Sequence, residues 1–274
     1  MRLIIAKNIG FCTGVKRALA IARDSLEKDP DPVYFLGEVI HNEKVIKEIK
    51  EKGGKIISNP KMAKSGTLII RAHGSPPFPL LKNVLIKDAT CPLVKRAQEA
   101  AKNLLQEGYK VMIIGEKKHP EVKGILGYIK NKGVVIENES EAKKLKKNRK
   151  MGVIAQTTQN FNKIEEILNI LNKKTNKLKW VNTLCPQVSS RQRELSEIIK
   201  NVDGVLVIGS PTSANTQNLA SIVKNNKKPV WLANSAKKIK KENFKKISSL
   251  GVVSGTSAPD WIIKEIIEKL EIIR

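Results

Sequence analysis

The sequence predicts an α/β fold built from three related modules, each with a small parallel sheet. Two observations carry this prediction. Short apolar runs alternate with amphipathic stretches of about 10 to 16 residues, which is the pattern of repeated βα units. Three segments also resemble one another, because Cys12, Cys91 and Cys185 are each followed by x-x-Val and then by an arginine. We expect the modules to span residues 1–82, 83–176 and 177–274.

Each module supplies two apolar runs that end in a polar turn. They are VYFLGEVIH from residue 33 and TLIIRAHG from residue 67, then VMIIGEKKH from residue 111 and MGVIAQTT from residue 151, then GVLVIGSPTS from residue 204 and LGVVSGTS from residue 250. Residues 15–26 and 94–105 have the spacing of amphipathic helices directly after a cysteine. We therefore expect a strand at each run and a helix after it.

The polar residues at the strand ends recur at similar distances from the cysteines. Steps of 28 or 29 residues, and of 61 to 72 residues, lead from the cysteines to His41, His119, Ser213, His73, Thr157 and Ser257. One such residue is often only a turn or a helix cap. However, all three cysteines and all three histidines fall on the pattern. Because open α/β sheets bind ligands at the carboxyl ends of their strands, the pattern indicates a binding site.

Charge and hydropathy limit the class of protein. The chain has 274 residues, a net charge of +25, and no apolar run long enough for a membrane span or a signal peptide. We expect a cytoplasmic protein without a membrane partner. The lysines are spread and rarely interleaved with aromatic residues, which favours a solubilising surface over a nucleic-acid site. The densest run, residues 143–150, is interpreted as a solvated helix end or loop, or as a docking site for an acidic electron carrier.

The three cysteines are too few and too dispersed for a disulfide framework. The start of a helix stabilises a metal-binding thiolate. If the modules are arranged about a pseudo-threefold axis, the three thiolates converge at its centre. They then suit an open zinc site, or a [4Fe–4S] cluster that lacks the usual fourth cysteine and keeps one iron open for a substrate oxygen. The residues alone leave zinc and iron as alternatives.

The polar residues around this centre indicate an anionic ligand. Donors at helix starts recognise phosphate oxygens, and the candidates are His41, His73, Thr157, Ser213, Asn215 and Ser257. The chain has neither a GxxxxGK[ST] motif nor GxGxxG after a strand, so a small diphosphate fits better than a nucleotide. Glu121, two residues after His119, is interpreted either as a proton donor or as an acid that complements a helix dipole.

Seven motifs stand in order along the chain: GFCTGVKRA, RAHG with Pro76, DATCP, HPEVKG, AQTT, NTLCP with Arg191 and Gln192, and SGTSAPD. With them, the sequence resembles the 4-hydroxy-3-methylbut-2-enyl diphosphate reductase family of the non-mevalonate isoprenoid pathway over essentially its whole length. The resemblance implies a trefoil of three α/β modules around one central [4Fe–4S] cluster. It also implies that ferredoxin or flavodoxin supplies electrons. We expect a monomer that binds no nucleic acid.

The resemblance further implies the role of each candidate residue. Cys12, Cys91 and Cys185 are the cluster ligands, and the diphosphate is held by His41, His73, His119, Ser213, Asn215 and Ser257. Thr157 lies close to the substrate hydroxyl, and Glu121 is the proton source. The implied reaction is a two-electron reductive dehydroxylation, in which the substrate alcohol binds the open iron, loses water, and is protonated to isopentenyl or dimethylallyl diphosphate.

Three residues depart from common family residues: Ala214, where a second serine is frequent, Val188 and Ser75. No binding role is therefore expected of Ala214. Two other functions stay open on the residues alone. One is a zinc-dependent hydrolase with a metal-bound water, which would be colourless. The other is a non-catalytic anion or nucleic-acid binder, which the charge of +25 suggests.

Overall fold

A computed structural model of the protein describes residues 1–29 and 32–273. The residues fall into two compact units. Unit 1 consists of residues 1–16, 41–45 and those from Pro186 onward, and unit 2 consists of residues 17–40 and 46–185. The expectation of an α/β fold with three small parallel sheets is confirmed. Within the described residues, no helix has the length and apolar character needed to cross a lipid bilayer.

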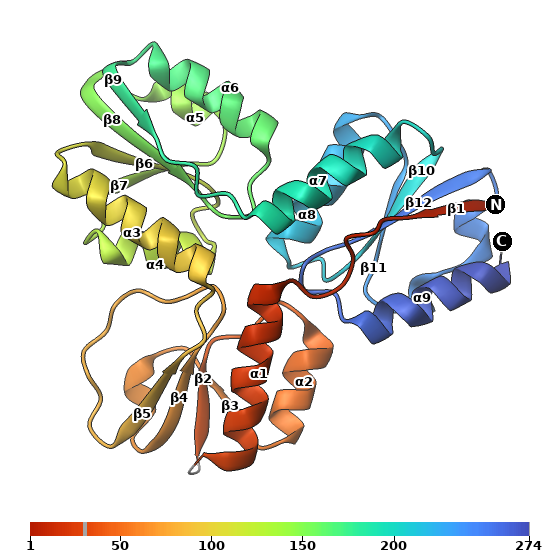
Figure 1. Ribbon diagram of the computed structural model, residues 1–274, viewed down its shortest axis with the longest axis horizontal. Coiled ribbons are helices and arrows are strands. Elements are labelled where there is room, and N and C mark those ends of the chain that lie inside the picture. The colour runs from red at the N-terminus through yellow and green to blue at the C-terminus, as the bar shows by residue number, and fades with distance from the viewer. Residues whose placement is uncertain (30–31, 274) are drawn as a thin grey trace. The chain divides into compact units, whose positions relative to one another are not determined.

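Unit 2 contains two four-stranded parallel sheets (Figure 1). One has the order β3-β2-β4-β5, from β2 (Val33–Leu36), β3 (Lys55–Ile57), β4 (Gly66–Ile70) and β5 (Val84–Asp88). The other has the order β7-β6-β8-β9, from β6 (Lys110–Ile114), β7 (Gly133–Ile136), β8 (Asn148–Ala155) and β9 (Thr175–Trp180). The helices that precede α7 in the chain are α1 (Thr13–Lys28), α2 (Glu43–Glu51), α3 (Pro92–Gln106), α4 (Pro120–Tyr128), α5 (Glu139–Lys144) and α6 (Phe161–Asn172), with the short 3-10 helix η1 (Pro60–Met62). Helices α1 and α2 begin in unit 1 and continue in unit 2.

Unit 1 contains the third sheet, in the order β1-β12-β10-β11. Its strands are β1 (Arg2–Ile5), β10 (Gly204–Ile208), β11 (Val230–Ala233) and β12 (Ser249–Ser254). Its helices are α7 (Pro186–Ile199), α8 (Ala214–Asn225) and α9 (Asp260–Ile273), with the short 3-10 helices η2 (Ala236–Lys238) and η3 (Lys241–Phe244).

The three sheets share one order of strands, and in each sheet one of the two outer strands is the segment before a cysteine. Strand β5 precedes Cys91, β9 precedes Cys185, and β1 precedes Cys12. Strand β1 therefore completes the sheet of the carboxyl-terminal part, with its residues paired in parallel from Arg2 with Ser249 onward. The division into domains near residues 82 and 176 stays a prediction, but sheet membership assigns β5 to the first sheet and β1 to the third.

Alternating apolar residues explain why the central strands are covered on both faces. In β10, Val205 and Val207 pack into one core cluster with α7 and α8, whereas Leu206 and Ile208 pack into another with α9. Strand β6 repeats the arrangement, with Val111 and Ile113 toward α3 and α4, and Met112 and Ile114 toward α6. Successive side chains of a strand point to opposite faces, so a continuous apolar run marks a strand buried on both sides.

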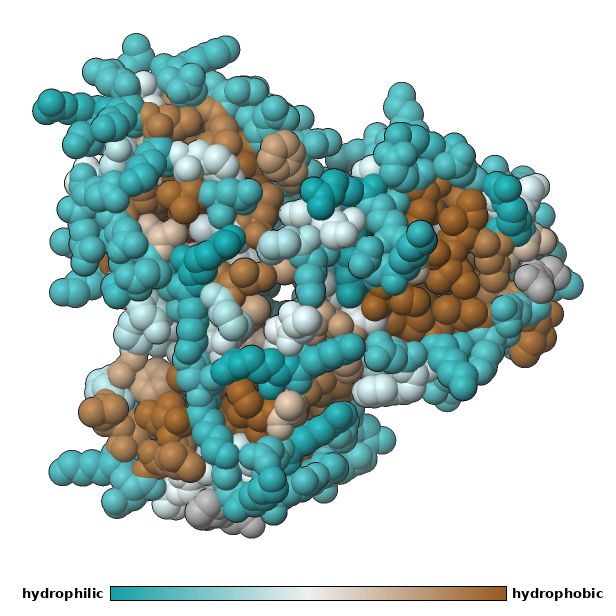
Figure 2. Space-filling view, viewed as in Figure 1, coloured by the Kyte–Doolittle hydropathy of each residue, from teal (hydrophilic) through white to brown (hydrophobic). Residues whose placement is uncertain are grey.

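The sheet of β2 to β5 differs from the other two. The run that ends at His73 is not followed by a helix, contrary to expectation: residues 74–81 form neither helix nor strand. Phe78 and Leu81 of this proline-rich loop cover a small cluster around Leu36 and Leu68 instead. Leu80 is 93% exposed, and Figure 2 shows apolar side chains at the surface in this region. Three prolines between residues 76 and 79 remove backbone donors and prevent a helix here.

The lysine-rich run at residues 143–150 is partly a strand. Helix α5 ends at Lys144, and β8 begins at Asn148 and pairs with β9. The interpretation of the whole run as a helix end or loop is therefore wrong for its last three residues. The ammonium of Lys174 donates to the carbonyls of Lys143 and Leu145, both at 2.6 Å, and fixes the intervening turn.

Candidate active site

All three cysteines stand at the start of a helix. Cys12 precedes α1, Cys91 is the N-cap of α3, and Cys185 precedes α7. Each is partly exposed and none forms a disulfide. The Sγ of Cys12 accepts the backbone N–H of Val15 at 3.4 Å. Such N–H groups at a helix start favour the thiolate, which is the form that binds metal.

Each cysteine is also tied through its backbone to a turn at the end of a strand. The cysteine N–H donates to a carbonyl in three equivalent bonds: Cys91 to Ala72 at 2.9 Å, Cys185 to Thr157 at 2.9 Å, and Cys12 to Thr256 at 3.1 Å. The three acceptors occupy the same position in turns that follow β4, β8 and β12. Thr157 is therefore the structural counterpart of Ala72 and Thr256. The counterpart of His73 and Ser257, which directly follow those two residues, is Thr158.

In unit 2, a buried carboxyl group is held by the Thr157 turn. Glu121 lies in the first turn of α4 and is only 1% exposed. One carboxyl oxygen accepts the backbone N–H of Thr157 at 2.7 Å, and the other accepts the Thr157 hydroxyl at 2.9 Å. An acid that served only the helix dipole would gain nothing from burial. The structure therefore favours the interpretation of Glu121 as a functional group.

Burial raises the pKa of Glu121 to about 7. The nearby charge of Glu116 raises it as well, while the two hydrogen bonds from Thr157 lower it. A carboxyl group whose pKa lies near neutral can both hold and release a proton under working conditions. Because the carbonyl of Thr157 accepts the Cys185 N–H, a single residue joins this acid to a cysteine.

Two histidines of unit 2 lie next to each other, from different strand ends. The rings of His73 and His119 are 5.4 Å apart between centroids and perpendicular. His119 is the N-cap of α4, and its Nδ1 accepts the backbone N–H of Glu121 at 3.2 Å. This bond places the proton of the neutral ring on Nε2 and makes Nε2 a donor.

In unit 1, three polar residues follow the ends of β10 and β12, which are neighbouring strands of one sheet. Ser213 is the N-cap of α8, and Asn215 and Ser257 are 2% and 5% exposed. Both polar atoms of the Asn215 amide and the Ser257 hydroxyl lack a hydrogen-bond partner in the described part of the chain. A buried polar atom without a partner costs about 1–3 kcal/mol, so this is where an external ligand would be expected to supply the missing bonds.

His41 belongs to the same unit through its neighbour Asn42. The Asn42 amide donates to the Ser257 carbonyl at 3.0 Å, and its Oδ1 accepts the N–H groups of Lys44 and Val45 at 3.1 and 3.2 Å. Asn42 thereby caps α2 and fixes the His41 turn to the Ser257 turn. The regular spacing of His41 and Ser257 indicated them in the sequence, but nothing in the sequence indicated Asn42.

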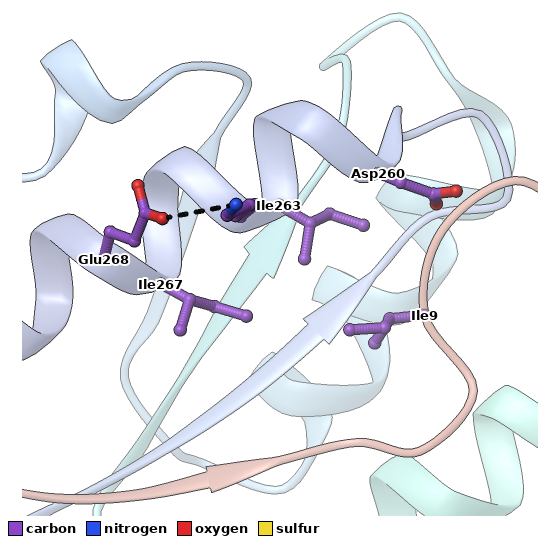
Figure 3. A pocket seen from close by; sticks show the side chains of 6 residues that line it. Ile9, Asp260, Ile263, Ile267 and Glu268 are labelled. Carbon is purple, nitrogen blue, oxygen red and sulfur yellow. Dashed lines mark ion pairs between the residues drawn. The ribbon is translucent and has the colours of Figure 1, made fainter.

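An open groove in unit 1 lies apart from these residues. It has a volume of about 340 Å³ and is lined by Ile9, Asp260, Ile263, Lys264, Ile267 and Glu268 (Figure 3). Lys264 and Glu268 form an ion pair at 3.9 Å along α9. The groove contains no cysteine or histidine and has a mainly apolar lining, so it does not have the chemistry of an anion site.

Comparison with known proteins identifies the family of the chain. The model of the LytB protein family matches residues 3–271. The 4-hydroxy-3-methylbut-2-enyl diphosphate reductase of Geobacter metallireducens is 37% identical over 98% of this chain and 97% of its own length. The corresponding reductase of Dictyoglomus turgidum is 40% identical over 99% of this chain and 96% of its own length.

Two solved structures are also similar. The E-1-hydroxy-2-methyl-but-2-enyl-4-diphosphate reductase of Plasmodium falciparum has a TM-score of 0.92 at 26% identity and covers 97% of this chain and 87% of its own. An (E)-4-hydroxy-3-methyl-but-2-enyl diphosphate reductase, described as the terminal enzyme of the non-mevalonate pathway, has a TM-score of 0.67 at 36% identity and covers 99% and 100%. The chain therefore belongs to the LytB protein family, the family of the 4-hydroxy-3-methylbut-2-enyl diphosphate reductases, which are oxidoreductases of isoprenoid synthesis.

Proposed function

We propose that the chain reduces 4-hydroxy-3-methylbut-2-enyl diphosphate to isopentenyl and dimethylallyl diphosphates, with Glu121 as the source of protons. The observation that carries this proposal is the position of Thr157. Its N–H and hydroxyl hold the buried Glu121 carboxyl, and its carbonyl holds the N–H of Cys185. The proposed proton donor, Glu121, and the proposed metal ligand, Cys185, are thus both hydrogen-bonded to the same residue.

The family implies an iron–sulfur cluster. We propose that it is a [4Fe–4S] cluster with Cys12, Cys91 and Cys185 as its three protein ligands and one open iron. The residues fit such a group, since each thiol is partly exposed at a helix start and outside any disulfide. When bound, the cluster would pass the two electrons one at a time from the external electron donor and would offer a Lewis-acidic site to the substrate alcohol.

The diphosphate is bound, in this proposal, by His41, His73, His119, Ser213, Asn215 and Ser257. Support comes from each unit separately. In unit 1, the buried Asn215 amide and Ser257 hydroxyl lack partners among the described residues. In unit 2, His119 has Nε2 as a donor, because its Nδ1 accepts a backbone N–H. Neutral or cationic donors of this kind pair with phosphate oxygens.

The reaction balances with two electrons and two protons. The carbon–oxygen bond of the substrate alcohol breaks, and the hydroxyl leaves as water after taking one proton. The remaining allylic group takes two electrons and a second proton, and the carbon that receives this proton decides which product forms. Protonated Glu121 donates one proton and takes up another from solvent before the second transfer. The Thr157 hydroxyl lies 2.9 Å from its carboxyl oxygen and orients it.

The test is to purify the protein without oxygen, measure iron and sulfide, and follow turnover of the diphosphate with a reduced viologen dye. Glu121→Gln should keep the cluster and substrate binding while turnover falls by about 10²–10⁴-fold, the usual contribution of a positioned acid. Glu139→Gln is the matched control, because Glu139 also lies in the first turn of a helix, α5, but is only half-buried and pairs with Lys143 at 3.6 Å. A colourless protein without iron, or full activity of Glu121→Gln, would contradict the proposal.

We also propose the electron donor, the oligomeric state and the location of the protein. Ferredoxin or flavodoxin serves as electron donor, and the net charge of +25 supports an acidic carrier. The chain acts as a monomer in the cytoplasm and binds no nucleic acid. Family membership decides against the zinc hydrolase and against a purely anion-binding protein.

A further inference from the structure

The arginine that follows each cysteine reaches the chain segment in front of the next cysteine. The guanidinium of Arg17, after Cys12, donates to the carbonyls of Thr90 at 3.2 Å and Asp88 at 3.3 Å. That of Arg96, after Cys91, donates to Asn182 at 3.2 Å and Leu184 at 3.5 Å. That of Arg191, after Cys185, donates to Gly10 at 2.7 Å and to Ser254 at 3.0 Å. In chain order, the last arginine returns to the first cysteine segment.

For Cys91 and Cys185, these contacts hold the second polar atom of the peptide group that carries the cysteine. In the peptide between Thr90 and Cys91, Arg17 binds the carbonyl and Ala72 accepts the N–H. In the peptide between Leu184 and Cys185, Arg96 and Thr157 do the same. A peptide group held at both its polar atoms cannot rotate, so the direction of the cysteine side chain after it is fixed.

Arg191 contacts the segment before Cys12 from a different position, and it binds the carbonyl two residues before the cysteine instead of the one directly before it. It stands six residues after its cysteine, whereas Arg17 and Arg96 stand five after theirs. This shift puts Arg191 where the other helices carry the fully buried Ala18 and Ala97, and Arg191 is only 7% exposed.

Its target, Gly10, has a φ of +83°, and a Cβ there would lie 2.1 Å from an Asp260 oxygen. Gly10 also donates its N–H to the Ser254 hydroxyl at 2.9 Å. Both backbone polar atoms of Gly10, two residues before Cys12, are thus hydrogen-bonded.

We propose that Arg17, Arg96 and Arg191 are positioning residues for the iron–sulfur cluster, each acting on the cysteine of the following segment and not on that of its own helix. The inference rests on the proposed cluster ligands. Each guanidinium brings a permanent positive charge and a planar fork of donors to a cysteine segment. The fork holds the ligand in place, and the charge favours the reduced, more negative cluster.

The test compares Arg17→Gln, Arg96→Gln and Arg191→Gln with the corresponding lysine variants. Arg23→Gln is the matched control, because Arg23 lies on the same helix as Arg17 but pairs with Glu48 at 3.0 Å. The measurements on the anaerobic full-length protein are the rate of iron release to a ferrous chelator and the reduction potential of the cluster. Hydrogen exchange of peptides that contain each cysteine is followed by mass spectrometry.

Iron release should be about 10- to 100-fold faster in the glutamine variants, as is usual when the partner of a metal ligand is lost. The reduction potential should become more negative with glutamine and stay near the parent value with lysine, which keeps the charge. Exchange should rise around Cys91 in Arg17→Gln and around Cys185 in Arg96→Gln, while the peptide with the arginine's own cysteine is unchanged. The lysine variants should release iron more slowly than the glutamine variants but still faster than the parent.

The proposal would be overturned if Arg17→Gln and Arg96→Gln matched the parent and Arg23→Gln in iron release and potential. These two side chains are exposed, so the variants are expected to fold even if Arg191→Gln does not. Faster exchange at the arginine's own cysteine would also contradict it. A parent protein that holds no iron would refute the proposed function instead, so the two failures are distinguishable.

Discussion

At the scale of residues, the pair of Glu121 and Thr157 sets the pH dependence of the reaction. The Thr157 hydroxyl lowers the pKa of Glu121 against the effect of burial, which raises it to about 7. In Thr157→Val this bond is lost, so the pKa of Glu121 should rise further. Because the protonated acid is the active form, the alkaline limb of the kcat–pH profile should move to higher pH.

Thr157→Ser keeps a hydroxyl at this position and should restore the original limb. The measurement is kcat at saturating substrate over the range in which the parent loses activity. An alkaline limb that stays in place in Thr157→Val, or moves to lower pH, would show that Glu121 does not control it.

The same carboxyl group carries a cost in stability. Its folded pKa of about 7 lies above the ordinary value of 4.5, so the folded state binds a proton more tightly than the unfolded chain does. Stability therefore decreases as pH rises from about 4.5 to about 7, and the full cost, about 3 kcal/mol, is reached above pH 7. Glu121→Gln removes the charge and can still bond to Thr157.

The glutamine variant should accordingly unfold at a higher temperature than the parent at pH 8, and the difference should vanish toward pH 4.5. Thermal unfolding followed by circular dichroism at a series of pH values checks this, with Glu139→Gln as the control. An equal change at all pH values would mean that the effect comes from packing and not from the buried charge.

At the scale of elements, the strands were easier to predict than the segments that connect them. Continuous apolar runs such as VLVI in β10 identified strands buried on both faces, and the repeat identified where the site residues stand. The three prolines between residues 76 and 79 could have excluded a helix after His73, but the way in which Phe78 and Leu81 cover the sheet depends on their packing and could not be predicted. The equivalence of Thr158 with His73 was missed because it depends on a backbone bond of Cys185.

The proline-rich loop after His73 covers one face of the β2–β5 sheet in place of a helix. Phe78 covers the small cluster on one face of the β2–β5 sheet, whereas Leu80 in the same loop is 93% exposed. Phe78→Ala should lower the free energy of unfolding by about 1–3 kcal/mol, less than a fully buried phenylalanine would lose. Leu80→Ala, the matched control, should change it by less than about 0.5 kcal/mol. Urea unfolding checks both, and equal effects would mean that the loop does not cover the sheet.

At the scale of the whole molecule, the first strand, β1, has the same place in its sheet as β5 and β9 have in theirs. Strand β1 stands in its sheet as β9 does in another, so the step from the last helix, α9, to the first strand, β1, corresponds to a helix-to-strand connection elsewhere in the chain. The equivalent position elsewhere is the short connection between α6 and β9, residues 173 and 174. Both ends of the chain belong to unit 1 (Figure 1), so a flexible linker of about ten Gly and Ser residues, with a mean span on the order of 15–20 Å, can join them.

A circular permutant that begins at Lys174, ends at Lys173 and carries this linker should therefore fold, because it makes β9 the first strand just as β1 is now. A second permutant, opened between Ala100 and Ala101 within α3, breaks a helix whose Ala101 is fully buried and should be insoluble or unfolded. Circular dichroism, thermal unfolding and iron content compare the two with the parent. If the first permutant failed as the second does, the amino-terminal position of β1 would itself be required for folding, and the three segments would be alike in structure but not interchangeable in the order in which they assemble.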